Sequence, residues 1–296
     1  MAAGRGLGGT GRFPRFESSL RARSEAFSHE EGGTWGKHGF PHATEQPPQA
    51  VAEEGSNGAV QGTRSRRDVS KAVELVIVDD AREVGSLVAE RLARATREGG
   101  NVVLTGGTTP KQAYEEAARR APDWSHVDVW WGDERCVPPD DDRSNYGMAK
   151  RALFDHLELA PRGVHRIKGE LGKDEAAADY DRELGDTPLD LVLLGVGPDG
   201  HVASLFPNAP TLRETRRVLP AEAGLEPFVD RVTLSIPALR SAAEVLFLVT
   251  GPEKAEAARS AFAAEPSPAT PAGLVRSECG STTAILDRAA AAKLQA

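Results

Sequence analysis

Two patterns of apolar and polar positions alternate from about Val73 to the C-terminus of the chain. Short, nearly continuous apolar runs are typical of strands that are buried on both faces of a sheet. Between these runs lie segments whose apolar residues recur on one helical face, as in residues 80–97. The predicted strands are residues 73–78, 101–104, 127–131, 189–194, 231–235, 245–249 and 283–286, and the predicted helices are residues 80–97, 144–157, 174–184, 252–264, one that starts at 109 and one that follows 287.

This alternation predicts βα units and therefore an α/β fold with a mostly parallel sheet covered by helices on both faces. Capping residues mark several of the predicted helix starts. Thr109 is predicted to cap its helix, with Pro110 at the first helical position and Gln112 completing a capping box. Asp287 is predicted to cap the last helix.

Residues 1–70 differ in composition from the rest of the chain. They are rich in Gly, Arg, Ser, His and Glu, contain linker-like runs such as Gln-Pro-Pro-Gln, and show no sustained period. Such a segment buries too little apolar surface to offset the entropy of ordering it. We therefore expect a disordered leader or an over-extended start, with a binding tail as the other interpretation, before a single domain formed by residues 71–296.

Composition and charge limit the classes of function. The chain is 27% charged and 40% hydrophobic, as in globular proteins, and its net charge of −8 argues against non-specific nucleic-acid binding. Its apolar runs are too short for membrane spans, and no secretory signal is evident. Cys136 and Cys279 form no paired motif, which argues against a disulfide framework or a zinc site. We expect a cytoplasmic protein, a monomer or weak homodimer, without nucleic-acid or membrane partners.

The end of the apolar run 189–194 carries the strongest candidate chemistry. The run breaks into Gly195-Val-Gly197-Pro-Asp199-Gly-His201, which places a carboxylate and an imidazole directly after a buried strand. In open α/β sheets, ligands bind at the carboxyl ends of the strands. An acid-oriented histidine there indicates general-base catalysis on a bound small molecule, although Pro-Asp-Gly is also a strong turn signal by itself.

Two further strand ends are candidate anion sites. Gly106, Gly107, Thr108 and Thr109 lie between a strand and a helix start, where backbone N–H groups and hydroxyls favour phosphate, unless this is an ordinary glycine-rich turn. Lys254 lies in an expected first helical turn, where a cation opposes the helix dipole unless it faces an anion. Arg231 at a strand start is a candidate bidentate partner, with solvated surface charge as the alternative for both cations.

A third group follows the strand 127–131. Asp133, Glu134 and Arg135 are candidates for binding sugar hydroxyls or for structural ion pairs, and Ser144 and Asn145 are predicted to cap a helix and face the cleft.

Three sequence motifs occur in an order that resembles one known family. They are Leu-Thr-Gly-Gly-Thr-Thr-Pro, then Gly-Asp-Glu-Arg-Cys-Val-Pro-Pro with Ser-Asn-Tyr-Gly, and then Gly-Val-Gly-Pro-Asp-Gly-His-Val-Ala-Ser-Leu-Phe-Pro. Together they resemble the glucosamine-6-phosphate isomerase/6-phosphogluconolactonase family, and more closely its lactonase branch. The resemblance runs from about Val73 to the C-terminus. It departs at Arg143, where many relatives carry an acidic residue.

The resemblance implies a Rossmann-like, doubly wound fold and hydrolysis of 6-phospho-D-glucono-1,5-lactone, a step of the oxidative pentose phosphate pathway. It implies no metal and no organic cofactor. Chemically, His201 would activate water and Asp199 would orient it, while Arg135 or backbone N–H groups near Gly197 would meet the oxyanion. A water bound to a metal held by the carboxylates and His201 is the competing mechanism.

Two other functions remain open at this stage. The first is an amino-sugar-phosphate isomerase/deaminase, whose members typically continue the Asp-Gly-His motif with Phe-Asn-Glu rather than with Ala203-Ser-Leu-Phe-Pro207. The second is a non-catalytic sugar-phosphate-binding regulator, which would need an upstream DNA-binding motif that residues 1–70 do not show.

Overall fold

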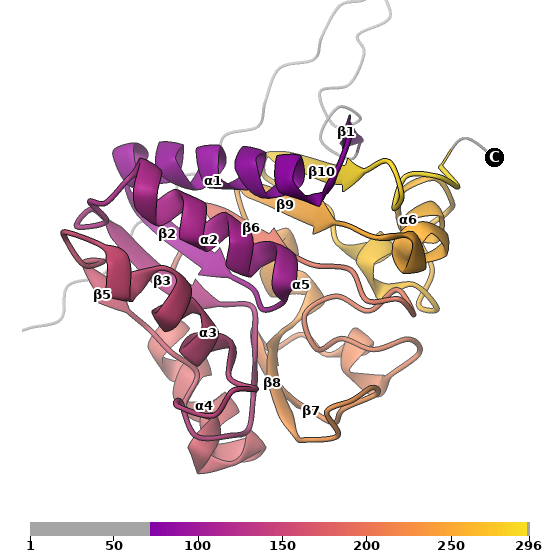
Figure 1. Cartoon of the computed structure of the whole chain (residues 1–296). Coiled ribbons are helices and arrows are strands. Elements are labelled where there is room, and N and C mark those ends of the chain that lie inside the picture. The colour runs from indigo at the N-terminus through magenta and orange to yellow at the C-terminus, as the bar shows by residue number, and fades with distance from the viewer. Residues whose placement is uncertain (1–71, 295–296) are drawn as a thin grey trace, which may run out of the picture. The chain divides into compact units, whose positions relative to one another are not determined.

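The structure is a computed structural model that describes residues 72–294, so the leader predicted for residues 1–70 lies outside the described residues. A seven-stranded sheet, parallel throughout, forms the centre (Figure 1). Its strands, in spatial order, are β1 (Val73–Val78), β10 (Ser281–Asp287), β9 (Glu244–Val249), β6 (Leu191–Leu194), β2 (Gly100–Leu104), β3 (Val127–Trp131) and β5 (Gly163–Val164). The predicted mostly parallel α/β sheet is confirmed.

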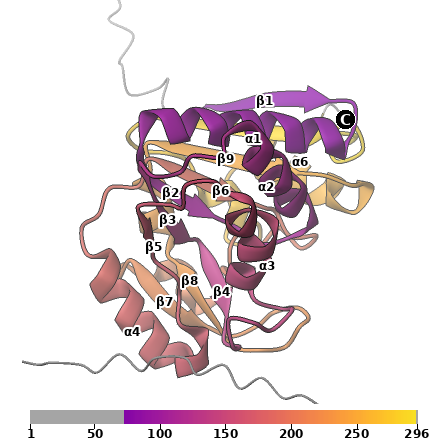
Figure 2. The same ribbon diagram turned by 60° about the vertical axis from the view of Figure 1, so that its left-hand side comes forward.

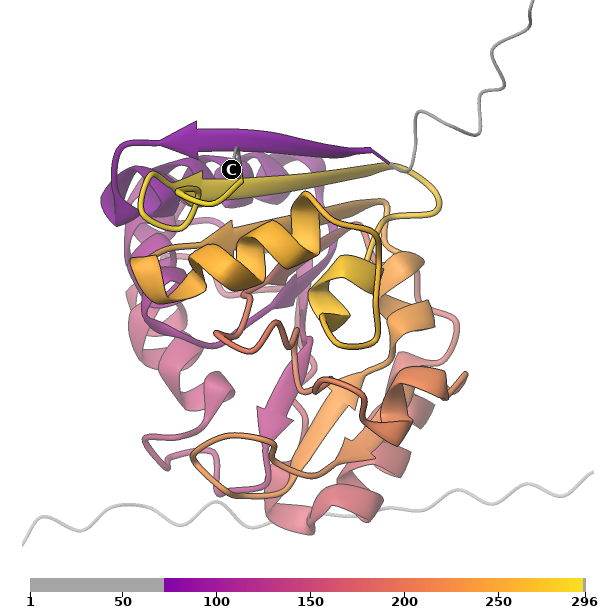
Figure 3. The same ribbon diagram turned by 90° about the vertical axis from the view of Figure 1, so that its right-hand side faces the viewer.

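Helices cover both faces of this sheet. The helices α1 (Ala81–Glu98) and α2 (Thr108–Arg120) pack side by side on one face, and α3 (Asn145–Ala152) lies beside α2 (Figure 2). On the opposite face, which Figure 3 turns toward the viewer, lie α6 (Ala255–Phe262) and the shorter α5 (Ile236–Arg240). This arrangement buries the apolar runs of the central strands on both sides, as all four residues of β6 show.

A second, smaller sheet was not predicted from the sequence. It is antiparallel and contains β4 (Asp133–Arg135), β8 (Arg231–Leu234) and β7 (Val218–Ala221), against which α4 (Lys173–Leu184) packs. The predicted strand 231–235 belongs to this sheet rather than to the parallel one. Strands of three or four residues, one of them with Pro220 inside it, are too short to show a reliable alternating period.

Two predicted helix caps are wrong. Helix α2 starts at Thr108 with Gly107 at its N-cap, and Thr109 does not cap it, because its hydroxyl hydrogen-bonds to that of Thr250 at 2.6 Å. Residues 288–294 form turns instead of a last helix. Asp287 accepts hydrogen bonds from the backbone N–H of Gly251 and of Ala290, so its carboxylate joins two loops.

Two other predicted helices are shorter than expected. The helix predicted for residues 144–157 ends at Ala152, and a 3₁₀ turn over Phe154–His156 follows it. The segment predicted as a helix from Pro252 begins with a 3₁₀ turn over Pro252–Lys254 and becomes α6 only at Ala255.

Two buried tyrosines hold the strand ends that lead into the site. The Tyr114 hydroxyl accepts from the backbone N–H of Thr105 at 2.9 Å and donates to the carbonyl of Thr105 at 2.8 Å. Tyr180 makes the same pair of bonds with Trp131, at 2.8 and 3.1 Å. Backbone groups at these positions lie where β2 and β3 stop, so the hydroxyls replace missing ladder partners.

Candidate active site

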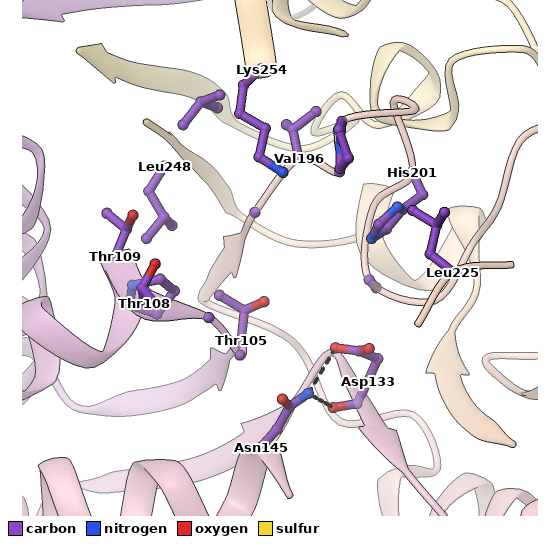
Figure 4. A pocket seen from close by; sticks show the side chains of 18 of the residues that line it. Thr105, Thr108, Thr109, Asp133, Asn145, Val196, His201, Leu225, Leu248 and Lys254 are labelled. Atoms are coloured by element: carbon purple, nitrogen blue, oxygen red, sulfur yellow. Dashed lines mark hydrogen bonds between the residues drawn. The ribbon is translucent and has the colours of Figure 1, made fainter. Parts of the chain in front are cut away.

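A pocket of about 480 Å³ opens at the carboxyl ends of the central strands (Figure 4). Segments that follow β2, β6 and β9 form its wall, together with residues of the small sheet. The predicted site residues in this wall are Gly106, Gly107, Thr108, Thr109, Asp133, Arg135, Asn145, Gly197, His201, Arg231 and Lys254. The fold thus brings together residues from three separate motifs, as expected for loops at one edge of a parallel sheet.

His201, which lines the pocket, forms a hydrogen-bonded pair with Asp199, which does not. The Nδ1 atom of His201 lies 2.6 Å from Oδ1 of Asp199, which also accepts from the backbone N–H of His201 at 3.1 Å. Partial burial alone would raise the pKa of Asp199, but its hydrogen bonds and attraction to His201 hold the pKa below its usual value. An ionised carboxylate only accepts hydrogen bonds, so Nδ1 carries a proton, and in the neutral imidazole the lone pair therefore lies on Nε2.

Residue 197 must be a glycine because the side chains of His201 and Asp199 pack directly against it. A Cβ atom at this position would overlap the imidazole ring of His201 and lie 2.6 Å from Oδ1 of Asp199, so only glycine fits against the pair. Its backbone N–H donates to the carbonyl oxygen of His201 at 2.8 Å. That donor is therefore already occupied, so the N–H of Gly197 itself is not available to an oxyanion, and Arg135 and the other backbone N–H groups near Gly197 stay as the predicted candidates.

The segment after β2 brings threonine hydroxyls to the pocket. Gly107 has a φ of +119°, which a residue with a side chain rarely adopts, and Thr108 and Thr109 follow in the first turn of α2. Gly106 packs so closely against the side-chain amide of Asn145 that a Cβ atom would overlap it. In Figure 4, Thr108 and Thr109 lie on the side of the pocket opposite to His201.

Lys254 reaches into the pocket from the start of α6 (Figure 4). Burial of its ammonium group lowers the pKa, and the nearby carboxylates of Glu253 and Asp199 offset this only in part. A half-buried cation at the start of a helix is unfavourable in the absence of an anion. The position of Lys254 therefore suits an anionic group bound in the pocket.

Two arginines stand opposite each other on paired strands of the small sheet. Arg135 of β4 is the register partner of Arg231 of β8, and Arg231 is only 5% exposed. Burial lowers the pKa of Arg231, and the neighbouring guanidinium of Arg135 lowers it further. Within the described residues, Nε of Arg135 is buried without a hydrogen-bond partner. Two adjacent cations with a spare donor favour binding of an anion or a polarised oxygen.

Asp133 is a buried acceptor in the pocket wall. One carboxylate oxygen accepts from the Asn145 amide at 3.2 Å, and the other accepts from the hydroxyl of Ser204 at 2.7 Å. Both donors are neutral, and within the described residues Asp133 forms no direct ion pair, so its carboxylate oxygens can accept further hydrogen bonds from sugar hydroxyls.

Ser144, which we predicted to face the cleft, lies behind the wall. It caps α3 through its bond from the N–H of Gly147, and its hydroxyl donates to Glu134 at 2.9 Å. Glu134 also accepts from the backbone N–H groups of Asn145 and Tyr146 at 2.8 Å, so its carboxylate faces the N-terminus of α3. Both residues therefore hold Asn145 in place rather than contact the pocket.

The side chain of Arg143, the point of departure from the family motif, turns to Asp141 at 2.7 Å. Its carbonyl oxygen accepts a hydrogen bond from Nη1 of Arg135. Because the backbone makes this contact, an arginine at this position preserves it.

A family model described as glucosamine-6-phosphate isomerases/6-phosphogluconolactonase matches residues 79–284. The chain belongs to this family. A 6-phosphogluconolactonase from Streptomyces coelicolor is 38% identical over 252 aligned positions, and the match covers 76% of this chain and 96% of that protein. The crystal structure of 6-phosphogluconolactonase from Thermotoga maritima has a TM-score of 0.65 and 31% identity, covering 73% of this chain and 99% of that one.

A monomeric glucosamine-6-phosphate deaminase also has a TM-score of 0.65, covering 75% of this chain and 100% of that one, but only 21% identity. It shows that the deaminase branch of the family shares this fold. The resemblance drawn from the three motifs is confirmed, since all three lie inside the matched range.

Several residues of the wall were not predicted. Thr105 and Phe206 belong to motifs that we quoted, and Thr250 follows the predicted strand 245–249, but their residue types gave no specific chemical signal. Leu225 and Glu226 come from the loop between β7 and β8, whose sequence has no motif at all. Only the packing of this loop beside Arg231, which donates to the carbonyls of Pro227 and Val229, brings these residues to the site.

The described residues contain no group of three His, Cys, Asp or Glu side chains arranged to hold a metal ion. Between residues 72 and 294, no helix combines the length and apolar character that crossing a bilayer requires.

Proposed function

We propose that this chain hydrolyses 6-phospho-D-glucono-1,5-lactone to 6-phospho-D-gluconate in the oxidative pentose phosphate pathway. The observation that carries the proposal is the His201–Asp199 pair, held at 2.6 Å, in a pocket that also contains Lys254 and Arg231. A base and a cationic anion site in one pocket suit a reactive, phosphorylated ester. The related 6-phosphogluconolactonases support this choice of substrate.

The reaction needs a base and stabilisation of one developing negative charge. Nε2 of His201 takes a proton from water while the water oxygen attacks C1 of the lactone, and the carbonyl oxygen becomes an oxyanion. Arg135 is our candidate for stabilising this oxyanion. When the bond between C1 and the ring oxygen breaks, the imidazolium returns its proton to that oxygen, and the product is a carboxylic acid that ionises.

Asp199 and the phosphate-binding residues act by orientation in this scheme. Asp199 keeps His201 in the tautomer with Nε2 unprotonated and stabilises the imidazolium that forms. The hydroxyls of Thr108 and Thr109, with Lys254 and Arg231, hold the phosphate. Because the phosphate is bound away from His201, it positions C1 near the base. Asp133 and Asn145 face the sugar hydroxyls.

The test is a direct assay of lactone decay with the purified full chain, coupled to oxidation of the 6-phosphogluconate formed. We expect decay well above the spontaneous rate, and no release of ammonia from glucosamine 6-phosphate. A lactone decay no faster than in buffer would refute the proposal, and ammonia release would favour the deaminase alternative.

A further inference from the structure

The hydrogen bond to Asp199 by itself does not fix the plane of the His201 ring. A single contact at Nδ1 leaves the imidazole free to swing about that point. Two neighbours restrict it: the backbone of Gly197, against which no Cβ atom fits, and the ring of Phe206. The centroids of the His201 and Phe206 rings are 4.9 Å apart and their planes are inclined by 44°.

Phe206 is in turn held by a loop that belongs to the other sheet. Phe206 is 8% exposed, and the backbone of Gly224, between β7 and β8, packs directly on its ring. A Cβ atom at residue 224 would lie 2.6 Å from Cδ1 of Phe206, closer than real Cβ contacts come. Gly224 does not have a left-handed φ, so the need for glycine there comes from Phe206 and not from the backbone conformation.

The ends of this loop are tied to the small sheet and to α4. Nζ of Lys173 lies 3.2 Å from Oε1 of Glu222 and 3.3 Å from Oδ1 of Asp230, the first and last polar residues of the loop. Arg231 donates to two carbonyls inside it. These bonds hold the loop while Gly224 packs against Phe206, and the loop residues Leu225 and Glu226 line the pocket.

We infer that Phe206 is a positioning residue for the proposed base, which keeps the imidazole of His201 aimed into the pocket, and that the loop at Gly224 holds Phe206 in that position. The inference rests on the proposed function for its effect on rate. A base displaced by about 1 Å can lose on the order of 100-fold in rate without a change in substrate affinity.

Three variants of the full chain test this inference. Phe206→Ala removes the ring, Phe206→Leu keeps apolar bulk without a flat face, and Gly224→Ala pushes the ring without replacing any residue that lines the pocket. Gly85→Ala is the matched control, because its Cβ atom would lie an ordinary 3.7 Å from the nearest atom. We expect kcat to fall about 10–100-fold in Phe206→Ala and less in Phe206→Leu and Gly224→Ala, with KM nearly unchanged.

A second measurement does not depend on activity. NOE cross-peaks between the ring protons of His201 and the Hα protons of Gly197 report whether the ring stays against that backbone, and the spectrum of His201→Ala identifies the His201 signals. We expect these cross-peaks in the wild type and in Gly85→Ala, and their weakening or loss in the Phe206 variants and in Gly224→Ala.

Unchanged cross-peaks in these variants, or a rise in KM with unchanged kcat, would overturn the inference. If the wild type proves inactive on the lactone, the proposed function fails, but the NOE measurement still decides the positioning role.

Discussion

A single imidazole nitrogen, Nε2 of His201, is the atom on which the proposed chemistry depends. Its basicity is available because Asp199 holds the proton on the other nitrogen and no side chain at residue 197 intrudes on the ring. Acid–imidazole pairs of this kind are usual where water must be deprotonated near neutral pH.

His201→Ala should leave the fold intact and remove most of the lactonase activity. The ring is partly exposed in the pocket, so its loss costs little packing, whereas a general base contributes about 10²–10⁴-fold to rate. Steady-state kinetics measure the loss of activity, and a thermal melt of the same preparation shows whether the fold is intact. Asp199→Asn should also lower kcat, because the amide of asparagine can donate a hydrogen bond to Nδ1 and so stabilise the tautomer whose proton is on Nε2. Wild-type rates in His201→Ala would exclude His201 as the base.

Lys254→Ala should raise KM for the phosphorylated lactone by about 10–100-fold, as expected for the loss of a charge-assisted hydrogen bond. Unphosphorylated gluconolactone is the control substrate, and its kinetics should hardly change. An equal loss on both substrates would mean that Lys254 acts near C1 or supports the fold.

The affinity for a phosphorylated ligand should depend on pH through the ionisation of Lys254. Burial lowers the pKa of its ammonium group, so as pH rises the cation is lost earlier than for an exposed lysine. Affinity for 6-phosphogluconate should therefore weaken in the alkaline range, with proton uptake on binding where the free lysine is partly neutral. Calorimetric titrations at several pH values measure this, and the dependence should disappear in Lys254→Ala. A dependence that survives the substitution would contradict it.

At the scale of elements, the site depends on where strands stop. The hydroxyls of Tyr114, from α2, and Tyr180, from α4, satisfy the backbone of Thr105, just beyond β2, and of Trp131, the last residue of β3. Segments that start from such fixed points can hold Thr108, the first residue of α2, and Asp133, the first residue of β4, with little freedom. The helices α2 and α4 therefore help to set the geometry of the chain that follows β2 and β3.

Tyr114→Phe should lower the free energy of unfolding by about 1–3 kcal/mol, since it leaves the buried N–H and carbonyl of Thr105 without their partner. Denaturant titration measures the change. Tyr146→Phe is the matched control, because no hydrogen bond of its hydroxyl is found among residues 72–294. Equal stability of the two variants would show that the backbone at Thr105 finds other partners.

At the scale of the whole molecule, every residue of the proposed site lies between Thr105 and Lys254. The predicted leader, residues 1–70, contributes no motif to it. A chain that begins at Ser70 should therefore have the same kcat and the same melting temperature as the full chain. A fall of ~2–4 °C would correspond to about 1 kcal/mol of contacts made by the leader, and would contradict the prediction.

The class of fold and most of the chemical groups of the site could be predicted from the sequence alone. Long, periodic segments such as α1 and apolar runs such as β6 were predictable because burial on one or both faces leaves a regular pattern. The three motifs contain most of the predicted residues that meet in the pocket. Their proximity followed from the rule that parallel strands bring their carboxyl ends to one edge.

The contacts that those groups make could be assigned only from their positions in three dimensions. Whether Thr109 caps its helix or bonds to Thr250, and whether Ser144 faces the pocket or Glu134, depends on partners in other segments of the chain, 141 and 10 residues away. The small antiparallel sheet and the loop at Gly224 leave no periodic signal, because their short strands and turns are stabilised by contacts with α4, Lys173 and Phe206. Such contacts between distant segments are a property of the packed molecule, so no local pattern encodes them.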